Sequence, residues 1–167
     1  MDQTVQHIVE RFELIPHPEG GYFREVYRSP LRVRHSGIAS GEADRCAGTL
    51  IYFLLAGQQF SAFHRVRWTD ELWHLYAGGP LQLHTIDETG HHSEILLSGD
   101  LTQNAPTALV PAGVWQAARP APSVPWAFGG CTVAPGFEFA DFQMPAGTEL
   151  RRRFPQHAEL ITALSRG

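Results

Sequence analysis

Residues 61–79, SAFHRVRWTDELWHLYAGG, decide the fold prediction, because two strand-like runs flank a polar turn in this stretch. Successive side chains of a strand point to opposite faces. His64 on the first run and Glu71 on the second can therefore converge inside a barrel. His74 faces the other way and joins them only where a β-bulge shifts the register.

The rest of the chain extends this pattern in both directions. Residues 22–142 hold many short β-rich runs separated by Gly, Pro, Asp and Asn, which is typical of a sandwich or barrel. Residues 1–15 show apolar side chains at helical spacing, and residues 148–167 return to that spacing. With 167 residues and no linker, the chain is expected to form one domain, all-β with a short helix at each end.

Composition excludes several classes of function. The net charge is −4, and the only basic cluster is the Arg run at residues 151–153, so nucleic acid is not an expected partner. No signal pattern or membrane-length apolar stretch occurs, which predicts a cytoplasmic protein without a membrane partner. Cys46 and Cys131 have no metal-site spacing and are expected to be buried free thiols.

At this point the residues resemble a family. Gly57, His64, Glu71 and Gly78 follow the first motif of the cupin superfamily, G-x5-H-x-H-x3,4-E-x6-G, with one extra residue after the first glycine. The second histidine of that motif is replaced by Val66. The resemblance implies a double-stranded β-helix, or jelly roll, a fold that hosts many unrelated activities.

The second cupin motif and the flanking segments strengthen the resemblance. In PAGVWQ, Pro111 and Gly113 fit the motif P-x-G-x2-H, and Gln116 stands where the histidine belongs. An uncharacterised cupin branch is similar in four segments, HPEGGYFREVYRS, HRVRWTDELWHLYAG, VPAGVWQAA and CTVAPGFEFADF. The resemblance also implies a homodimer, paired through sheet edges near the N-terminal strand.

One interpretation of these residues is a divalent metal site. If a metal binds, the ligands are expected to be His64, Glu71 and Gln116. The valine at position 66 cannot coordinate, and an amide oxygen is a weaker donor than imidazole, so we expect low affinity. No cofactor is assigned, and a divalent metal stays open. A metal-dependent enzyme with this reduced ligand set remains an alternative.

The second interpretation uses the same groups for binding and proton transfer. His64 with Glu71 fits a catalytic acid–base dyad, while the Gln116 amide can orient a hydroxyl or carbonyl of the ligand. Metal-free deoxysugar epimerases of the cupin fold work by histidine-centred proton abstraction, so the resemblance implies an isomerase or epimerase acting on a sugar-like or nucleotide-like molecule. The expected ligand-binding residues are Glu25, Tyr27, Trp73, His74 and Gln116.

Aromatic and loop residues complete the expectation. Trp115 is a further surface on which a sugar ring or base can stack. If Glu25 and Tyr27 face inward, Arg28 faces outward. His17 lies between two prolines and is interpreted as a turn residue. A non-catalytic binding or sensing module with the same pocket remains open beside the enzyme.

Overall fold

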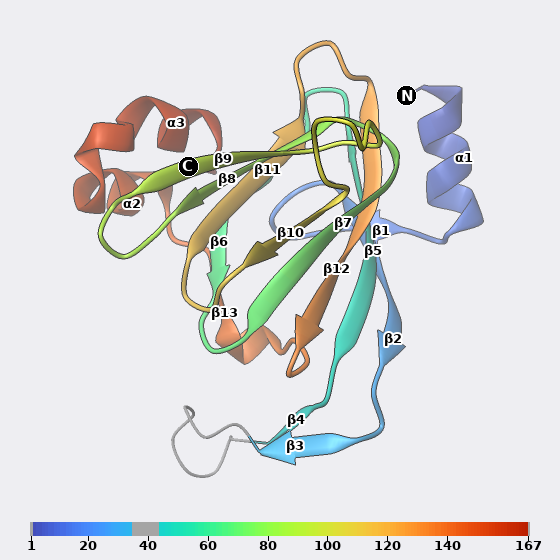
Figure 1. The fold of residues 1–167 in the computed structure, drawn as a ribbon, viewed down its shortest axis with the longest axis horizontal. Coiled ribbons are helices and arrows are strands. Elements are labelled where there is room, and N and C mark those ends of the chain that lie inside the picture. The colour runs from blue at the N-terminus through green and yellow to red at the C-terminus, as the bar shows by residue number, and fades with distance from the viewer. Residues whose placement is uncertain (1, 35–43, 167) are drawn as a thin grey trace.

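The structure is a computed structural model that describes residues 2–34 and 44–166. Two β-sheets face each other and form a jelly-roll barrel, and helices occur near both ends of the chain, as the sequence predicts (Figure 1). The six-stranded sheet has the order β1-β2-β5-β12-β7-β10. The five-stranded sheet has the order β13-β6-β11-β8-β9, and β3 and β4 form a separate ribbon.

The strands are short, and every pairing among the described strands is antiparallel. The first sheet contains β1 (Ile15–Pro16), β2 (Tyr22–Arg28), β5 (Thr49–Ala56), β7 (Asp70–Gly78), β10 (Thr107–Val110) and β12 (Trp126–Ala134). The second contains β6 (Ser61–Val66), β8 (Leu81–Ile86), β9 (His92–Leu97), β11 (Trp115–Pro120) and β13 (Phe142–Gln143). The ribbon consists of β3 (Arg32–Arg34) and β4 (Asp44–Cys46).

The helices are all short. They are α1 (Gln3–Arg11), α2 (Gly147–Arg153) and α3 (Ala158–Ala163), with 3-10 turns η1 (Phe139–Asp141) and η2 (Pro155–His157). The expected C-terminal helix is thus divided in two. Because proline lacks a backbone N–H and clashes with the preceding turn, Pro155 ends α2 and starts the next turn instead.

The core between the sheets follows the predicted alternation. On β7, Glu71, Trp73 and Leu75 point into the barrel and are buried, whereas the side chains between them face outward. Trp73 and Leu75 pack with Leu83 and Leu97 from the opposite sheet in one apolar cluster. Burying an apolar side chain of this size contributes about 1.5–3 kcal/mol, so this cluster holds the two sheets together.

Helices cover part of the outer surface of each sheet. Val5 and Ile8 of α1 pack on Leu54 and Phe128 of the six-stranded sheet. The side chain of Asp2 caps this helix by accepting from the Thr4 backbone N–H at 2.7 Å.

The C-terminal segment covers the other sheet. Leu150 and Ile161 pack on Phe63 of β6, opposite the barrel interior. For this reason β6 is buried on both faces, with His64 inward and Phe63 outward.

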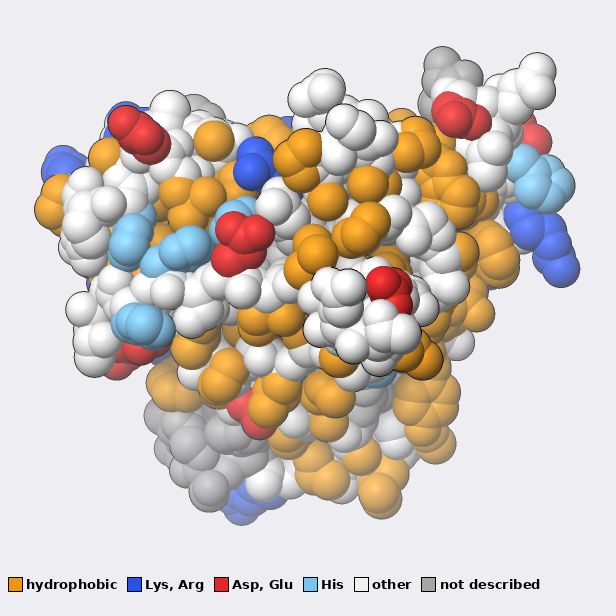
Figure 2. Space-filling view, turned by 45° about the horizontal axis from the view of Figure 1, so that its top comes forward, with side chains coloured by type: hydrophobic (Ala, Val, Ile, Leu, Met, Phe, Trp, Pro, Cys, Tyr) orange, Lys and Arg blue, Asp and Glu red, His pale blue; other side chains and the backbone are white. Residues whose placement is uncertain are grey.

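Histidines connect the C-terminal segment to the hairpin of β8 and β9. His157 Nε2 donates to the Gly90 carbonyl at 2.8 Å, and its ring packs near that of His92. Nδ1 of His84 and Nε2 of His92 lie 3.2 Å apart. Figure 2 shows histidine side chains, in pale blue, gathered on this flank. His92 is half-buried in this contact because the helical segment packs over it.

Candidate functional site

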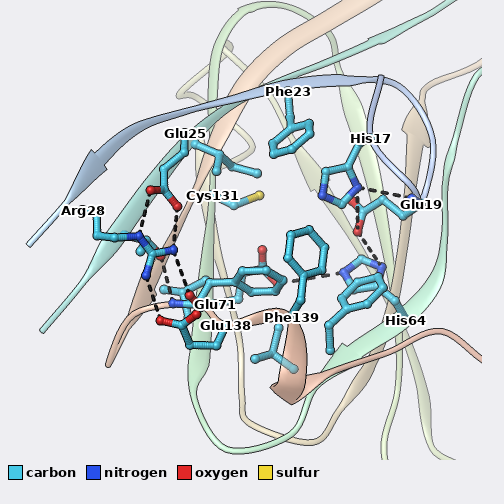
Figure 3. A pocket seen from close by; sticks show the side chains of 16 residues that line it. His17, Glu19, Phe23, Glu25, Arg28, His64, Glu71, Cys131, Glu138 and Phe139 are labelled. Atoms are coloured by element: carbon cyan, nitrogen blue, oxygen red, sulfur yellow. Dashed lines mark hydrogen bonds and ion pairs between the residues drawn. The ribbon is translucent and has the colours of Figure 1, made fainter. Parts of the chain in front are cut away.

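One pocket opens between the two sheets at the end of the barrel nearest η1. Its empty volume is about 620 Å³ when the solvent-open mouth is counted with it. Side chains from β2, β5, β6, β7, β12, β13 and two loops line it (Figure 3). The lining residues are His17, Glu19, Phe23, Glu25, Arg28, Thr49, Ile51, His64, Val66, Glu71, Cys131, Val133, Phe137, Glu138, Phe139 and Phe142.

His64 and Glu71 meet inside the barrel, as the alternation of their strands predicts. Nε2 of His64 lies 4.0 Å from Oε2 of Glu71, and both side chains are almost completely buried. Nδ1 of His64 lies 2.9 Å from the Ala62 carbonyl, which can only accept a hydrogen bond. The neutral imidazole therefore carries its proton on Nδ1 and presents the Nε2 lone pair to Glu71 and the pocket.

A hydrogen-bonded chain behind the pocket holds Glu71 in place. The indole N–H of Trp73 donates to Oε1 of Gln116 at 2.7 Å, and Nε2 of Gln116 donates to Oε2 of Glu71 at 2.5 Å. Because an indole N–H can only donate, it fixes which end of the amide is oxygen. Gln116 and Trp73 thus position the carboxyl of Glu71 from outside the pocket lining.

At the inner end of the pocket, the sequence prediction missed two residues, and both lie on the loop between β1 and β2. His17, interpreted there as a turn residue, lines the pocket, and Glu19 lies between His17 and His64. Oε2 of Glu19 is 3.6 Å from His17 Nδ1 and 3.4 Å from His64 Nδ1. The hydroxyl of Ser61 donates to the other carboxyl oxygen at 2.9 Å.

The glycine pair after Glu19 makes this loop possible. Gly20 and Gly21 have φ values of 121° and 70°, a region that L-residues with a side chain rarely adopt. A Cβ on Gly20 would clash with the Phe60 carbonyl, and one on Gly21 with the Leu54 carbonyl. The loop can therefore press against β5 and β6 and bring Glu19 into the barrel.

Burial shifts the ionisation of the four inner groups toward their neutral forms. The pKa of Glu19 is raised to about 8, because burial opposes charge more strongly than the Ser61 hydrogen bond favours it. Burial also raises the pKa of Glu71. The pKa of His17 is lowered to about 3 by burial and by neighbouring His64, and burial likewise lowers the pKa of His64. Protonated carboxyls and neutral imidazoles can donate and accept protons at neutral pH.

The mouth of the pocket carries an Arg28 guanidinium between two carboxylates. Nε and one terminal nitrogen of Arg28 each donate to Glu25 at 2.8 Å, and the other terminal nitrogen donates to Glu138 at 2.9 Å. Glu25 lines the pocket as expected, but the orientations predicted for Tyr27 and Arg28 are wrong. A register shift between Glu25 and Tyr27 exchanges the two faces, so Arg28 turns inward and Tyr27 is 53% exposed outside.

Three other aromatic or imidazole side chains are outside the pocket lining. Trp73 is buried behind it and serves as the partner of Gln116. His74 stays on the outer face of the sheet, where its Nε2 lies 2.9 Å from the Thr132 hydroxyl. The register shift between β7 and β12 comes after His74 in the strand and therefore does not turn it inward. Trp115 packs with the C-terminal helices. None of these three rings can stack on a ligand in this pocket.

The predicted ligand set does not fit a metal ion. The Gln116 oxygen is occupied by the Trp73 indole, and the amide presents N–H groups toward Glu71. Val66 lines the pocket at the position of the second motif histidine and has no donor atom. Among residues 2–34 and 44–166, no group of three or more His, Cys, Asp or Glu has the geometry to hold a metal. A metal would have only His64 and Glu71 of the predicted set.

Two further findings concern membrane-spanning helices and the cysteine thiols. No helix among the described residues is long and apolar enough to cross a membrane. Cys46 and Cys131 are free and buried, as expected. Cys131 lines the pocket, where burial raises the pKa of its thiol.

Comparison with known proteins identifies related chains of similar length. A hypothetical protein from Leishmania major is 29% identical with a TM-score of 0.89, covering 97% of this chain and 98% of the other. Protein SO0799 from Shewanella oneidensis is 33% identical with a TM-score of 0.84, covering 96% of each chain. The uncharacterized protein YML079W of Saccharomyces cerevisiae is 27% identical over 157 residues, 87% of this chain and 77% of that protein.

More distant likenesses include cupin enzymes. Oxalate decarboxylase from B. subtilis shares 15% identity with a TM-score of 0.53 over 89% of this chain and 36% of its own, which shows a common fold alone. The model of the family described as Cupin superfamily (DUF985) matches residues 6–145, most of the sequence. The chain is therefore a member of the cupin superfamily, in this DUF985 branch.

Proposed function

We propose that this cupin binds a small polar molecule, sugar-like or nucleotide-like, and isomerises or epimerises it by acid–base chemistry. The observation that carries the proposal is the buried pair of His64 and Glu71, whose facing atoms lie 4.0 Å apart at the wall of a pocket. Titratable groups with shifted pKa values in a cleft are typical of catalytic sites.

The roles of the two groups follow from their protonation. His64 acts as the base through the Nε2 lone pair and takes a proton from a ligand carbon next to a carbonyl. Glu71, whose pKa is raised by burial, serves as the acid and gives its proton to the carbonyl oxygen. The ligand is then an enol, His64 is charged and Glu71 is ionised. Return of both protons restores the enzyme and yields the substrate or its isomer.

The lining supports a ligand of mixed polarity. The two ends of the pocket carry ionisable groups, and phenylalanine rings lie between them (Figure 3). An apolar wall with a few convergent polar groups is the usual composition of a small-molecule site. A ring bearing hydroxyls can pack one face on such a wall while its oxygens reach His64 and Glu71.

Solvent exchange tests the proposal directly. Metabolites are first screened by thermal shift, because a ligand at a hundred times its Kd adds about 2.7 kcal/mol of stability. Each ligand found is then incubated with the protein in D2O and analysed by mass spectrometry. We expect deuterium at the exchanged carbon with the wild type and with His74→Gln, whose imidazole lies outside the pocket, and no exchange with His64→Gln.

The other outcomes assign a different function. If ligands bind but none exchanges or converts, the acid–base reaction is refuted and the non-catalytic binding module is favoured. If protein purified without chelator carries near-stoichiometric metal that His64→Ala abolishes, the metal-dependent alternative is favoured. Binding that is unchanged in His64→Gln while exchange is lost supports a role in catalysis, not in affinity.

A further inference from the structure

The mouth of the pocket has more negative than positive charge. Arg28 lies between Glu25 and Glu138, with charged-group contacts of 2.8 and 2.9 Å, and each of these three side chains is 37–38% exposed. One guanidinium and two carboxylates give this cluster a charge of −1. Because the three groups are at the opening, a ligand meets this charge on entry.

Arg28 has no donor left for a ligand. A guanidinium has five N–H groups. Two donate to Glu25 and one to Glu138, one contacts the Phe137 carbonyl at 3.2 Å, and one contacts the sulfur of Cys46 at 3.6 Å. An incoming phosphate or carboxylate would have to displace one of the two carboxylates that already bind the guanidinium. The anion would then stay close to the displaced carboxylate, which carries the same sign of charge.

The inner end of the pocket does not supply a cation either. Its basic lining residues, within the part of the chain that the structure describes, are His17 and His64. Burial lowers the pKa of both, so the rings are neutral near pH 7. Glu19 and Glu71 are beside them and add negative charge whenever they ionise. An anion therefore finds no positive partner at either end.

The middle of the pocket suits a cation. Phe23 and Phe139 lie between the arginine end and the histidine end (Figure 3). The face of an aromatic ring carries partial negative charge and attracts ammonium groups. Glu138 contacts Arg28 through Oε1, and no described residue is bonded to its Oε2. This carboxylate oxygen and the phenylalanine faces together match a protonated amine.

We propose that the pocket selects a ligand with a protonated amino group on a small polar body, as in an amino sugar, and rejects phosphorylated or carboxylated counterparts. The proposal rests on the proposed function only in taking this pocket as the ligand site. It narrows the substrate class from sugar-like or nucleotide-like molecules to cationic, unphosphorylated ones. The amine lies against Glu138 and Phe139, and the reacting carbon lies toward His64.

Three aromatic probes of one shape test the charge selection. Benzylamine, benzyl alcohol and benzoate are titrated separately against the full chain at pH 7, with binding followed by ligand-observed NMR. We expect the affinity to fall in that order, with benzylamine favoured over benzoate by about tenfold or more, as expected for one charge contact near a protein surface. In Glu138→Gln this preference shrinks about tenfold.

A surface variant and a folding measurement make the result decisive. Glu94→Gln removes a carboxylate outside the pocket and should leave the preference unchanged. The melting temperature of each variant shows that it is folded. Benzoate binding as tightly as benzylamine, binding of none of the three probes, or an unchanged preference in folded Glu138→Gln would each overturn the proposal. Selective amine binding without any deuterium exchange would refute the proposed reaction and leave the charge selection intact.

Discussion

Replacing Glu19 by glutamine should stabilise the protein, and by an amount that depends on pH. The carboxyl has an ordinary pKa of 4.5 and a pKa of about 8 in the folded state. Between these values the unfolded chain releases the proton and the folded chain keeps it. Stability therefore falls as pH rises through this window. At about 1.4 kcal/mol per pH unit, the cost at pH 7 is about 3 kcal/mol.

Glutamine has the shape of the protonated side chain and cannot ionise. It keeps an oxygen for the Ser61 hydroxyl, which donates to Glu19 at 2.9 Å in the wild type. The histidines shift stability in the opposite sense, because their lowered pKa values make stability fall toward acid pH. These contributions are common to both proteins and cancel in the difference between variant and wild type.

Urea unfolding at pH 4.5 and pH 7 measures that difference. We expect the difference in free energy of unfolding, Glu19→Gln minus wild type, to be about 3 kcal/mol larger at pH 7 than at pH 4.5. For a chain of this size, this corresponds to about 6–12 °C in Tm. As a control, Glu88→Gln changes a side chain that is 75% exposed in a turn and should alter stability by less than about 0.5 kcal/mol at either pH. A difference that does not grow between pH 4.5 and 7 would refute the assignment of a buried, protonated Glu19.

Two further predictions concern the support of the site and the assembly of the chain. Trp73→Phe leaves the buried oxygen of Gln116 without its donor. The free energy of unfolding in urea should fall by about 1–3 kcal/mol, and deuterium exchange of the ligand should slow. A loss of stability near zero would show that the hydrogen-bonded chain does not hold the site. We also propose a homodimer, because β1 pairs only with Tyr22 and Phe23 and leaves the rest of that side of β2 unpaired among the described strands, and because Tyr27 is exposed on β2. Light scattering should give twice the chain mass of 18.6 kDa. We expect Tyr27→Asp to be monomeric and Leu101→Asp, which changes an exposed residue between β9 and β10, to stay dimeric. A monomeric wild type would refute the dimer.

The meeting of His64 and Glu71 could be predicted because it depends on local properties. Strand alternation fixes which face each side chain takes, and the short turn between the strands brings those faces together. The bond between Trp73 and Gln116 could not be predicted in this way, because it joins residues 43 positions apart and depends on how the two sheets pack. Sequence therefore identified both residues but assigned them to the ligand instead of to each other.

The errors at the mouth and in the first loop have different causes. A single extra residue in β2 reversed the faces of Tyr27 and Arg28, and such a bulge leaves no mark in hydrophobic periodicity. The loop that carries His17 and Glu19 has no periodicity at all. Its signal was the pair Gly20 and Gly21, because consecutive residues with positive φ allow a loop to press into a barrel that an ordinary turn would leave open.

The energetics of the inner pocket argue for chemistry over packing. Two carboxyls and two imidazoles are held in an environment that opposes their charged forms, and for Glu19 alone this costs about 3 kcal/mol at pH 7. An apolar side chain would fill the same space without that cost, as Val66 already does beside His64. Stability given up at a site is a common consequence of function. If Glu19→Gln is more stable than wild type and also slower in deuterium exchange, the cost and the chemistry belong to the same carboxyl.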